Sequence, residues 1–275
     1  MNGYKTLKHK VLRILREEGL RSLAKKAFRY VSLKIRLYCY FIWFLMKRPK
    51  QITGRYIILK RFRQIHKCVP CAHSEVELLH IADEILRVPS NVKGDIIECG
   101  VWKGGSTCKL SIVAKMTGRK LIACDSFEGL PEPEEHDRMH VHSDGYVEIY
   151  KKGDFASSIG EVKANLRKFG EPKSVELVKG WFNETLPKLR NRKVVLVFID
   201  VDLQESIKCC LQHLWPILVK GGKFFTHEAH HALTFKLLND KNFWKNLGEV
   251  TPPKFIGALK GLGKLEPCLG YLQKC

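Results

Sequence analysis

Acidic residues are scarce in the first part of this chain. The sequence has 275 residues and a formal net charge of +20. Residues 1–67 hold only two acids, Glu17 and Glu18, beside 19 Lys and Arg, for a net charge of +17. The 29 basic and 26 acidic residues that follow leave residues 68–275 at only +3. The basic excess therefore belongs to an N-terminal extension at 1–67, and we expect one near-neutral domain at 68–275.

The sequence also lacks an apolar run long enough to cross a bilayer. The unbroken run Leu37–Met46 has ten residues, whereas a spanning helix needs about 20. It lies too deep in the chain for a secretory signal. Its aromatic residues and flanking cations, and the basic amphipathic pattern at 20–31, favour an anionic membrane surface. Two alternatives stay open: packing on the domain or in a homodimer, and nucleic-acid binding, which contiguous apolar residues disfavour.

A disulfide framework is not indicated, although the chain has ten cysteines. Several cysteines fall in expected core elements or side by side on a helix, which favours reduced thiols and therefore a cytoplasmic location. If the extension binds a membrane, we expect the protein to be peripheral on that membrane. Residues 66–73, H-K-C-V-P-C-A-H, hold a C-x-x-C without the second pair of a zinc ribbon. We interpret this segment as a structural loop or a cofactor-facing lip, with zinc binding as the alternative.

The G-x-G-x-x-G fingerprint of dinucleotide sites is missing, which argues against NAD. Instead, residues 95–107, D-I-I-E-C-G-V-W-K-G-G-S-T, indicate a buried strand, a glycine turn and the start of a helix. Glu98 is placed to favour the ammonium and sulfonium of S-adenosylmethionine, directly or through water. A short strand ending at Asp125 puts a carboxylate where α/β cofactor folds bind ribose. The alternative is a glycine turn that binds no ligand.

Strands and helices alternate through the domain, which predicts a mostly parallel α/β sheet. A capping box at Ser74 and Glu77 begins a helix that runs to about Arg87. Residues 126–152 have no clean period, and we interpret them as a lid over the substrate, with a plain solvated loop as the alternative. Further helices are expected at 106–116, 158–169 and up to Leu214, strands at 175–178, 194–199 and 223–226, and a closing hairpin at 254–259 and 265–273.

Four motifs occur in order: G-D-I-I-E-C-G-V-W-K-G-G-S (94–106), D-S-F-E-G-L-P (125–131), V-K-G-W-F-N-E-T-L-P (178–187) and F-I-D-V-D-L-Q-E-S (198–206). With them the chain resembles, over roughly residues 69–265, the macrocin O-methyltransferase family of S-adenosylmethionine-dependent enzymes. The resemblance implies the Rossmann-like, seven-stranded class I methyltransferase sheet with helices on both faces. It also implies that Asp125 to Phe127 hold ribose and adenine. The predicted cofactor site comprises Ser74, Glu98, Gly100, Val101, Trp102, Gly104, Ser106, Asp125, Ser126, Phe127, Gly180, Trp181 and Phe182.

Asp200 matches the aspartate that serves this family as magnesium ligand and base, and a carboxylate aided by a cation can deprotonate a hydroxyl during in-line attack on a methyl group. The family commonly has two adjacent aspartates where this chain has His227 and Glu228. Because magnesium prefers oxygen ligands, His227 disfavours it. Three interpretations stay open. Asp200, His227 and Glu228 bind manganese, iron or zinc; His227 acts as a base that titrates near pH 6.5; or the site is degenerate.

The primary hypothesis is a methyltransferase that uses S-adenosylmethionine to methylate a hydroxyl of a small molecule, such as a sugar, a lipid-linked glycan or a natural product. One alternative is a non-catalytic protein that binds this cofactor or docks on a membrane. Another is an RNA methyltransferase whose basic arm contacts phosphates. An NAD-dependent sugar oxidoreductase is a more distant alternative.

Overall fold

The computed structural model describes residues 25–141, apart from 27 and 29, and residues 147–275. The chain divides into two compact units, Met1–Ile52 and Thr53–Cys275. In the first unit, residues 30–46 are helical and Pro49–Gln51 form the 3-10 helix η1. None of the helices in these described ranges is both long enough and apolar enough to cross a bilayer. Most of the amphipathic pattern expected at 20–31 lies outside the described residues.

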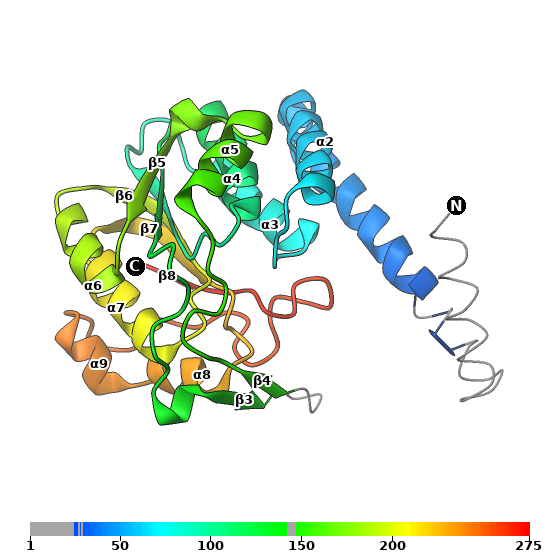
Figure 1. The fold of residues 1–275 in the computed structure, drawn as a ribbon. Helices are drawn as coiled ribbons and strands as arrows, with labels where there is room; N and C mark the ends of the chain where they lie inside the picture. The colour runs from blue at the N-terminus through cyan, green and yellow to red at the C-terminus, as the bar shows by residue number, and fades with distance from the viewer. Residues whose placement is uncertain (1–24, 27, 29, 142–146) are drawn as a thin grey trace. The chain divides into compact units, whose positions relative to one another are not determined.

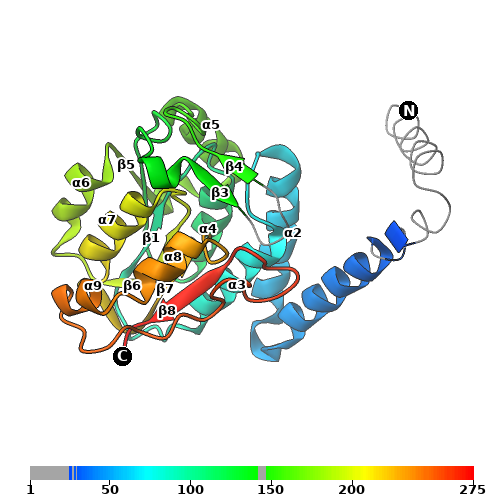
Figure 2. The same ribbon diagram turned by 90° about the horizontal axis from the view of Figure 1, so that it is seen from below.

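The second unit is built on a six-stranded sheet with the order β5-β2-β1-β6-β7-β8. Neighbouring strands are parallel except for the antiparallel pair β7 and β8, and β8 forms one edge (Figure 2). This confirms the mostly parallel α/β sheet, whose strand order reverses between β1 and β6. The strands are β1 (Asp95–Cys99), β2 (Leu121–Asp125), β5 (Val175–Lys179), β6 (Val194–Ile199), β7 (Leu218–Thr226) and β8 (Gly270–Gln273).

Helices cover both faces of this sheet, with α3, α4 and α5 on one side and α6 and α7 on the other (Figure 1). The predicted capping box at the start of α3 is present, since the Ser74 hydroxyl accepts from the Glu77 amide and the Glu77 carboxylate accepts from the Ser74 amide. The helices are α2 (Ile52–Cys68), α3 (Glu75–Arg87), α4 (Gly105–Met116), α5 (Ile159–Phe169), η3 (Pro172–Ser174), α6 (Phe182–Thr185), η4 (Leu186–Leu189), α7 (Gln204–Leu214), α8 (Ala232–Leu238) and α9 (Lys241–Asn246).

The second compact unit begins at Thr53 and so includes nearly all of α2, whose side chains contact the rest of the unit. Arg55 is fully buried and pairs with Asp83 of α3. Arg61 contacts Glu171 at 2.7 Å and donates to the carbonyl of Phe169 at 2.7 Å. Part of the basic charge assigned to the extension thus belongs to the domain.

The main core lies between β1, β2, β6 and β7 and the helices α7 to α9. The indoles of Trp215 and Trp244 pack edge to face inside it at a centroid distance of 5.0 Å, and both are almost completely buried. Burial of a large apolar side chain stabilises a fold by about 1.5–3 kcal/mol. All ten cysteines are free, with Cys99, Cys124 and Cys210 buried in this core.

Two details differ from the sequence-based prediction. The sheet has six strands rather than seven, because only β8 of the expected closing hairpin is a strand. Its partner segment is reduced to a single bridge from Ile256 to Tyr271, between Pro253 and the left-handed Gly257. The expected lid contains regular structure: η2 (Glu135–Asp137) and an antiparallel pair, β3 (Met139–Val141) and β4 (Val147–Ile149).

Candidate active site

Four neighbouring strands end at the same level, which brings distant residues together. Cys99 of β1 is paired with Cys124 of β2 and with Ile199 of β6, and Ile199 is paired with Thr226 of β7. The next residue along each strand lies at the carboxyl edge of the sheet, where ligands bind in open α/β folds. These next residues are Gly100, Asp125, Asp200 and His227.

The loop after β1 requires glycine at the point where it passes β6. Gly100 has φ +88°, and a Cβ there would lie 1.8 Å from the carbonyl oxygen of Asp200. Gly104, with φ +80°, is the left-handed N-cap of α4, whose N-terminus makes no side-chain capping bond. Backbone amide groups at such a helix start are suited to a carboxylate.

Asp125 holds two strained loops in place. Its Oδ2 accepts from the amides of Val101 at 2.6 Å and Trp102 at 3.3 Å, and its Oδ1 accepts from the amide of Phe127 at 2.6 Å. Trp102 and Phe127 both have positive φ, 44° and 57°, which non-glycine residues rarely adopt. Asp125 therefore shapes both sides of the opening between β1 and β2.

A cavity of about 300 Å³ lies above these strand ends, at the lower end of the size range of small-molecule sites. Residues that sequence reasoning did not assign to the cofactor also line it, among them Cys71, His73, Phe155 and Asp202. Within the segment 66–73, residues 70–73 line the cavity, whereas residues 66–68 form the end of α2. The predicted site residues that line the cavity are Gly100, Val101, Trp102, Ser106, Asp125, Ser126, Gly180, Trp181, Phe182, Asp200 and His227.

Other predicted cofactor residues lie behind the cavity wall. The Ser74 hydroxyl is used in the capping box of α3 and also donates to the carbonyl of Leu265 at 3.2 Å. Gly104 packs against Val162, and Phe127 is buried in the loop after β2. These positions shape the lining residues rather than face the cavity.

Glu98 is fully buried beneath the first turn of α4. Burial raises the pKa of this carboxyl to about 7, although the nearby hydroxyls of Ser106 and Thr107 act in the opposite direction. Ser106 does line the cavity, so it stands between Glu98 and a ligand. A cation bound in the cavity would favour the ionised form of Glu98.

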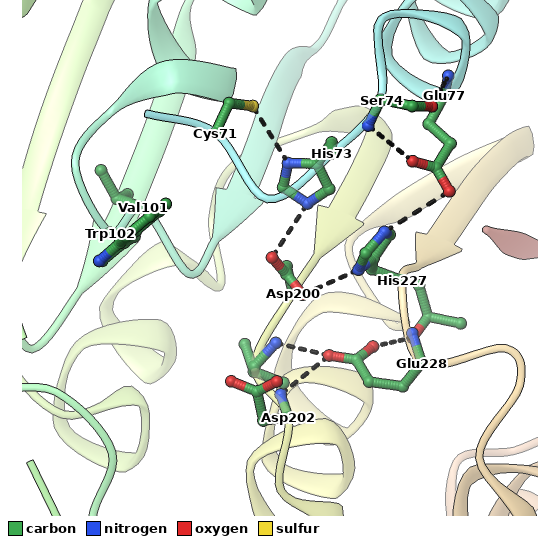
Figure 3. A network of polar contacts seen from close by, with 12 residues as sticks. Cys71, His73, Ser74, Glu77, Val101, Trp102, Asp200, Asp202, His227 and Glu228 are labelled. Carbon is green, nitrogen blue, oxygen red and sulfur yellow. Dashed lines mark hydrogen bonds and ion pairs between the residues drawn. The ribbon is translucent and has the colours of Figure 1, made fainter. Parts of the chain in front are cut away.

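Asp200 lies between two histidines (Figure 3). His73 Nε2 is 2.9 Å from Asp200 Oδ2, and His227 Nδ1 is 3.3 Å from Asp200 Oδ1. The two imidazole rings meet edge to face at 4.6 Å. The outer nitrogens also have partners, since His73 Nδ1 is 3.7 Å from the sulfur of Cys71 and His227 Nε2 is 3.5 Å from Glu77 Oε1. His73 precedes the capping box of α3, and nothing in its sequence spacing linked it to Asp200.

The cluster stabilises charged side chains. Burial by itself lowers the pKa of His73, but the charge and hydrogen bond of Asp200, together with the contact with Cys71, raise it to about 9. Burial likewise opposes protonation of His227, yet Asp200 and Glu77 raise its pKa well above 6.5. Both imidazoles hold the pKa of Asp200 well below its usual value, against the effect of burial. The expectation that His227 titrates near pH 6.5 is therefore wrong for this cluster, because two carboxylates face its ring.

The ligand set predicted from the sequence required Glu228 to lie beside His227 and Asp200. The structure instead turns the Glu228 carboxylate away from them. Its Oε1 accepts from the amides of Val201 at 2.6 Å and Asp202 at 2.9 Å, and its Oε2 accepts from the hydroxyl of Thr226. Glu228 is 2% exposed and fixes the loop after β6. Ligand atoms do converge, within 4.8 Å of one another, in the group His73, Asp200 and His227, and His227 also forms such a group with Glu77 and Cys268. Two imidazoles and one carboxylate do not fit a magnesium ion, which prefers oxygen ligands.

Comparison with known proteins agrees with this architecture. A family model described as Macrocin-O-methyltransferase (TylF) matches residues 75–233. The chain is 33% identical over 142 residues to the 8-demethyl-8-(2,3-dimethoxy-alpha-L-rhamnosyl)-tetracenomycin-C 4'-O-methyltransferase of Streptomyces olivaceus, a match that covers 48% of this chain and 51% of the relative. It is 30% identical over 145 residues to the demethyldecarbamoylnovobiocin O-methyltransferase of Streptomyces niveus, covering 49% and 52%. The chain thus spans about half the length of the curated relatives that it matches.

Among solved structures, the O-methyltransferase NovP superposes with a TM-score of 0.56 at 25% identity, over 74% of this chain and 83% of NovP. The calicheamicin methyltransferase CalS11 superposes with a TM-score of 0.54 at 21% identity, over 80% and 92%. At that identity the second likeness concerns the fold alone.

Proposed function

Because this chain belongs to the macrocin O-methyltransferase family (TylF), we propose that it transfers a methyl group from S-adenosylmethionine to a hydroxyl of a small molecule. The observation that carries the proposal is one cavity lined both by the glycine turn after β1 and by the cluster around Asp200. A methyl donor and a hydroxyl that needs activation require these two features side by side.

In this proposal the cofactor lies across the ends of β1, β2 and β5. Asp125 is the proposed ribose partner, and the N-terminus of α4 receives the methionine carboxylate. Ser106 and Glu98 stand on the methionine side, where a negative charge favours the ammonium and the sulfonium. Trp181, which lines the cavity beside Gly180, is the proposed adenine contact.

Asp200 is the proposed proton acceptor. Its low pKa keeps it ionised at neutral pH, and about a fifth of its side chain remains accessible from the cavity. The acceptor hydroxyl donates a hydrogen bond to Asp200 and passes its proton to this carboxylate as the oxygen takes the methyl group. His73 and His227 orient the carboxylate and, when protonated, stabilise its charge. We derive no step through magnesium, because the donor set does not fit it.

We propose a sugar hydroxyl as the acceptor class. The relative from Streptomyces olivaceus is named for methylation of a rhamnosyl group. In this chain Trp102 and Phe155 form an aromatic wall on the cavity, with a centroid distance of 6.5 Å. Apolar faces of sugar rings pack well on such side chains.

Calorimetric titration with S-adenosylmethionine, and NAD as comparator, tests the cofactor. We expect micromolar affinity, about −8 kcal/mol, for the first ligand alone. Methyl transfer to a panel of glycosides is then followed by mass spectrometry, with Asp200→Asn as the inactive variant. Full activity of Asp200→Asn would contradict the role of Asp200, and cofactor binding without transfer to any hydroxyl would favour a non-catalytic binding protein.

We further propose that the first unit binds an anionic membrane surface. Its helix carries an exposed apolar stripe at helical spacing, formed by Val31, Ile35, Tyr38, Ile42 and Met46. Residues 1–52 contain 14 Lys and Arg against two Glu, and cations near an anionic surface add about 1 kcal/mol each. Co-sedimentation with anionic vesicles tests this, and a homodimer through the same stripe is the alternative outcome.

A further inference from the structure

The cluster of His73, Asp200 and His227 has the composition of a transition-metal site. Nε2 of His73, a carboxylate oxygen of Asp200 and Nδ1 of His227 lie within 4.8 Å of one another. All three residues line the cavity, so a cation held there would be reachable by a ligand. Two histidines and one carboxylate that leave positions open are a recurrent arrangement for divalent iron and related metals.

The surroundings of the two histidines support this reading independently. A metal-binding histidine usually engages its other ring nitrogen with a carboxylate or another polar group, which fixes the ring and its tautomer. Here His227 Nε2 faces Glu77 Oε1 at 3.5 Å, and the other oxygen of Glu77 accepts from the Ser74 amide at 2.9 Å. His73 Nδ1 faces the sulfur of Cys71 at 3.7 Å. Both inner nitrogens are thereby directed at Asp200.

The Glu228 carboxylate, which the sequence placed in the metal site, is used elsewhere. Glu228 accepts the amides of Val201 and Asp202 and so belongs to the loop after β6. Imidazole suits zinc, iron, cobalt and nickel, whereas magnesium demands a near-octahedral set of oxygens. The cluster therefore differs in kind from the oxygen-rich site that the family resemblance implies.

We propose that His73, Asp200 and His227 bind a borderline divalent transition metal, such as Zn²⁺ or Fe²⁺, in preference to Mg²⁺, with Glu77 and Cys71 holding the two imidazoles in place. The proposal deepens the proposed function, since the metal lies on the wall of the proposed cofactor and acceptor cavity. Its test is nevertheless independent of turnover.

The experiment uses the untagged chain of residues 1–275, freed of metal with a chelator and titrated with Co²⁺, whose visible absorption reports imidazole ligation. We expect one bound equivalent, displaced by micromolar Zn²⁺ but not by millimolar Mg²⁺. His73→Gln and His227→Gln each abolish the absorption band, while Glu77→Gln and Cys71→Ser weaken affinity about 10- to 100-fold. His80→Gln is the matched control, because His80 pairs with Glu266 at 2.6 Å outside the cluster and should leave the titration unchanged.

His227→Asp keeps the test decisive if the glutamine variants fold poorly. An added carboxylate should retain a cation site but shift its preference toward Mg²⁺ or Mn²⁺. Absence of Co²⁺ binding, an unchanged Co²⁺ spectrum in His73→Gln and His227→Gln, or equal competition by Mg²⁺ would overturn the proposal. Parallel titration with S-adenosylmethionine distinguishes failure of the metal-site proposal from failure of the proposed function. If the protein binds S-adenosylmethionine but not Co²⁺, only the metal-site proposal is refuted. If it does not bind S-adenosylmethionine, the proposed function is refuted.

Discussion

At the scale of single residues, Asp125 has two roles, and one substitution removes both. Its carboxylate accepts three backbone amides, from Val101, Trp102 and Phe127, and it is also the proposed ribose partner. We predict that Asp125→Ala weakens S-adenosylmethionine binding by at least about tenfold, which corresponds to about 1.4 kcal/mol. Calorimetry measures the loss. Glu128→Ala, at an exposed position three residues on, is the control, and equal affinities for both variants would refute the assignment.

Glu98 gives cofactor binding a pH dependence of defined sign. Its pKa of about 7 in the free protein means that it is largely protonated below pH 7, and binding a cation favours the ionised form. Affinity for S-adenosylmethionine should therefore rise with pH up to about 7, by at most about tenfold per pH unit, with proton release. Calorimetry in buffers of different ionisation enthalpy detects that proton. Glu98→Gln should flatten the profile, and an unchanged slope in this variant would assign the proton to another group.

The same shift acts on the stability of the free protein in the opposite direction. The folded-state pKa of Glu98 lies above the 4.5 of a solvated glutamate, so the folded chain holds more protons than the unfolded chain between these two pKa values. The contribution of Glu98 to the free energy of unfolding is thus greatest below pH 4.5 and is lost as the pH rises through 7. A buried carboxyl kept for ligand binding costs stability at the pH where it functions.

At the scale of elements, the start of α3 joins a helix cap to the active site. The Ser74 hydroxyl caps the helix, and the Glu77 carboxylate both completes the box and faces His227. We predict that Ser74→Ala lowers the free energy of unfolding by about 1 kcal/mol. Cofactor affinity should stay within about twofold of wild type, because the hydroxyl serves α3 and Leu265 rather than the cavity. Chemical denaturation measures the free energy of unfolding, and calorimetry measures the affinity for S-adenosylmethionine. A large loss of affinity would show that Ser74 does belong to the cofactor site.

The segment that the sequence predicts as a lid is held against α7 by a buried carboxylate. Asp137 of η2 is 1% exposed and accepts from the amide of Gln204 at 2.8 Å, in the first turn of a helix whose N-cap, Leu203, provides no side-chain cap. Asp137→Ala should cost about 1 kcal/mol of stability and speed proteolytic cleavage within residues 131–141. Glu135→Ala, an exposed neighbour, is the control. Equal cleavage rates for the two variants would show that Asp137 does not anchor the lid.

Most of the correct sequence-based predictions came from the patterns of single strands and helices. Strand periodicity and the strand-end rule placed Asp125, Asp200 and His227 at one edge of the sheet, because parallel strands align their ends whatever the intervening chain does. They could not place His73, whose contact with Asp200 depends on the direction of the loop before α3. They also misassigned Glu228, since a strand-end carboxylate can serve backbone amides as readily as a ligand. Sequence patterns along single strands thus predict which residues lie at the carboxyl edge of the sheet. Side-chain packing, which these patterns do not contain, determines which of them face the cavity.

At the scale of the whole molecule, charge and apolar exposure are distributed unevenly. Residues 1–52 carry 14 Lys and Arg against two Glu, and their helix exposes the stripe that contains Ile42, which is 61% exposed. The second unit holds the cavity and the buried core. This division suggests that one unit sets location and the other performs chemistry, which would bring a lipid-linked acceptor to the enzyme on the membrane plane.

Vesicle binding should therefore depend on the first unit alone. We predict that the chain of residues 1–275 sediments more with phosphatidylglycerol vesicles than with phosphatidylcholine vesicles, and that sedimentation falls as salt screens the cations. Ile42→Ser should lower partitioning about 30-fold, since burial of this side chain is worth about 2 kcal/mol. Val250→Ser is the matched control, because Val250 is an apolar residue 95% exposed in the second unit. If Ile42→Ser instead dissociates a dimer in light scattering and leaves sedimentation unchanged, the stripe is a subunit interface and not a membrane contact.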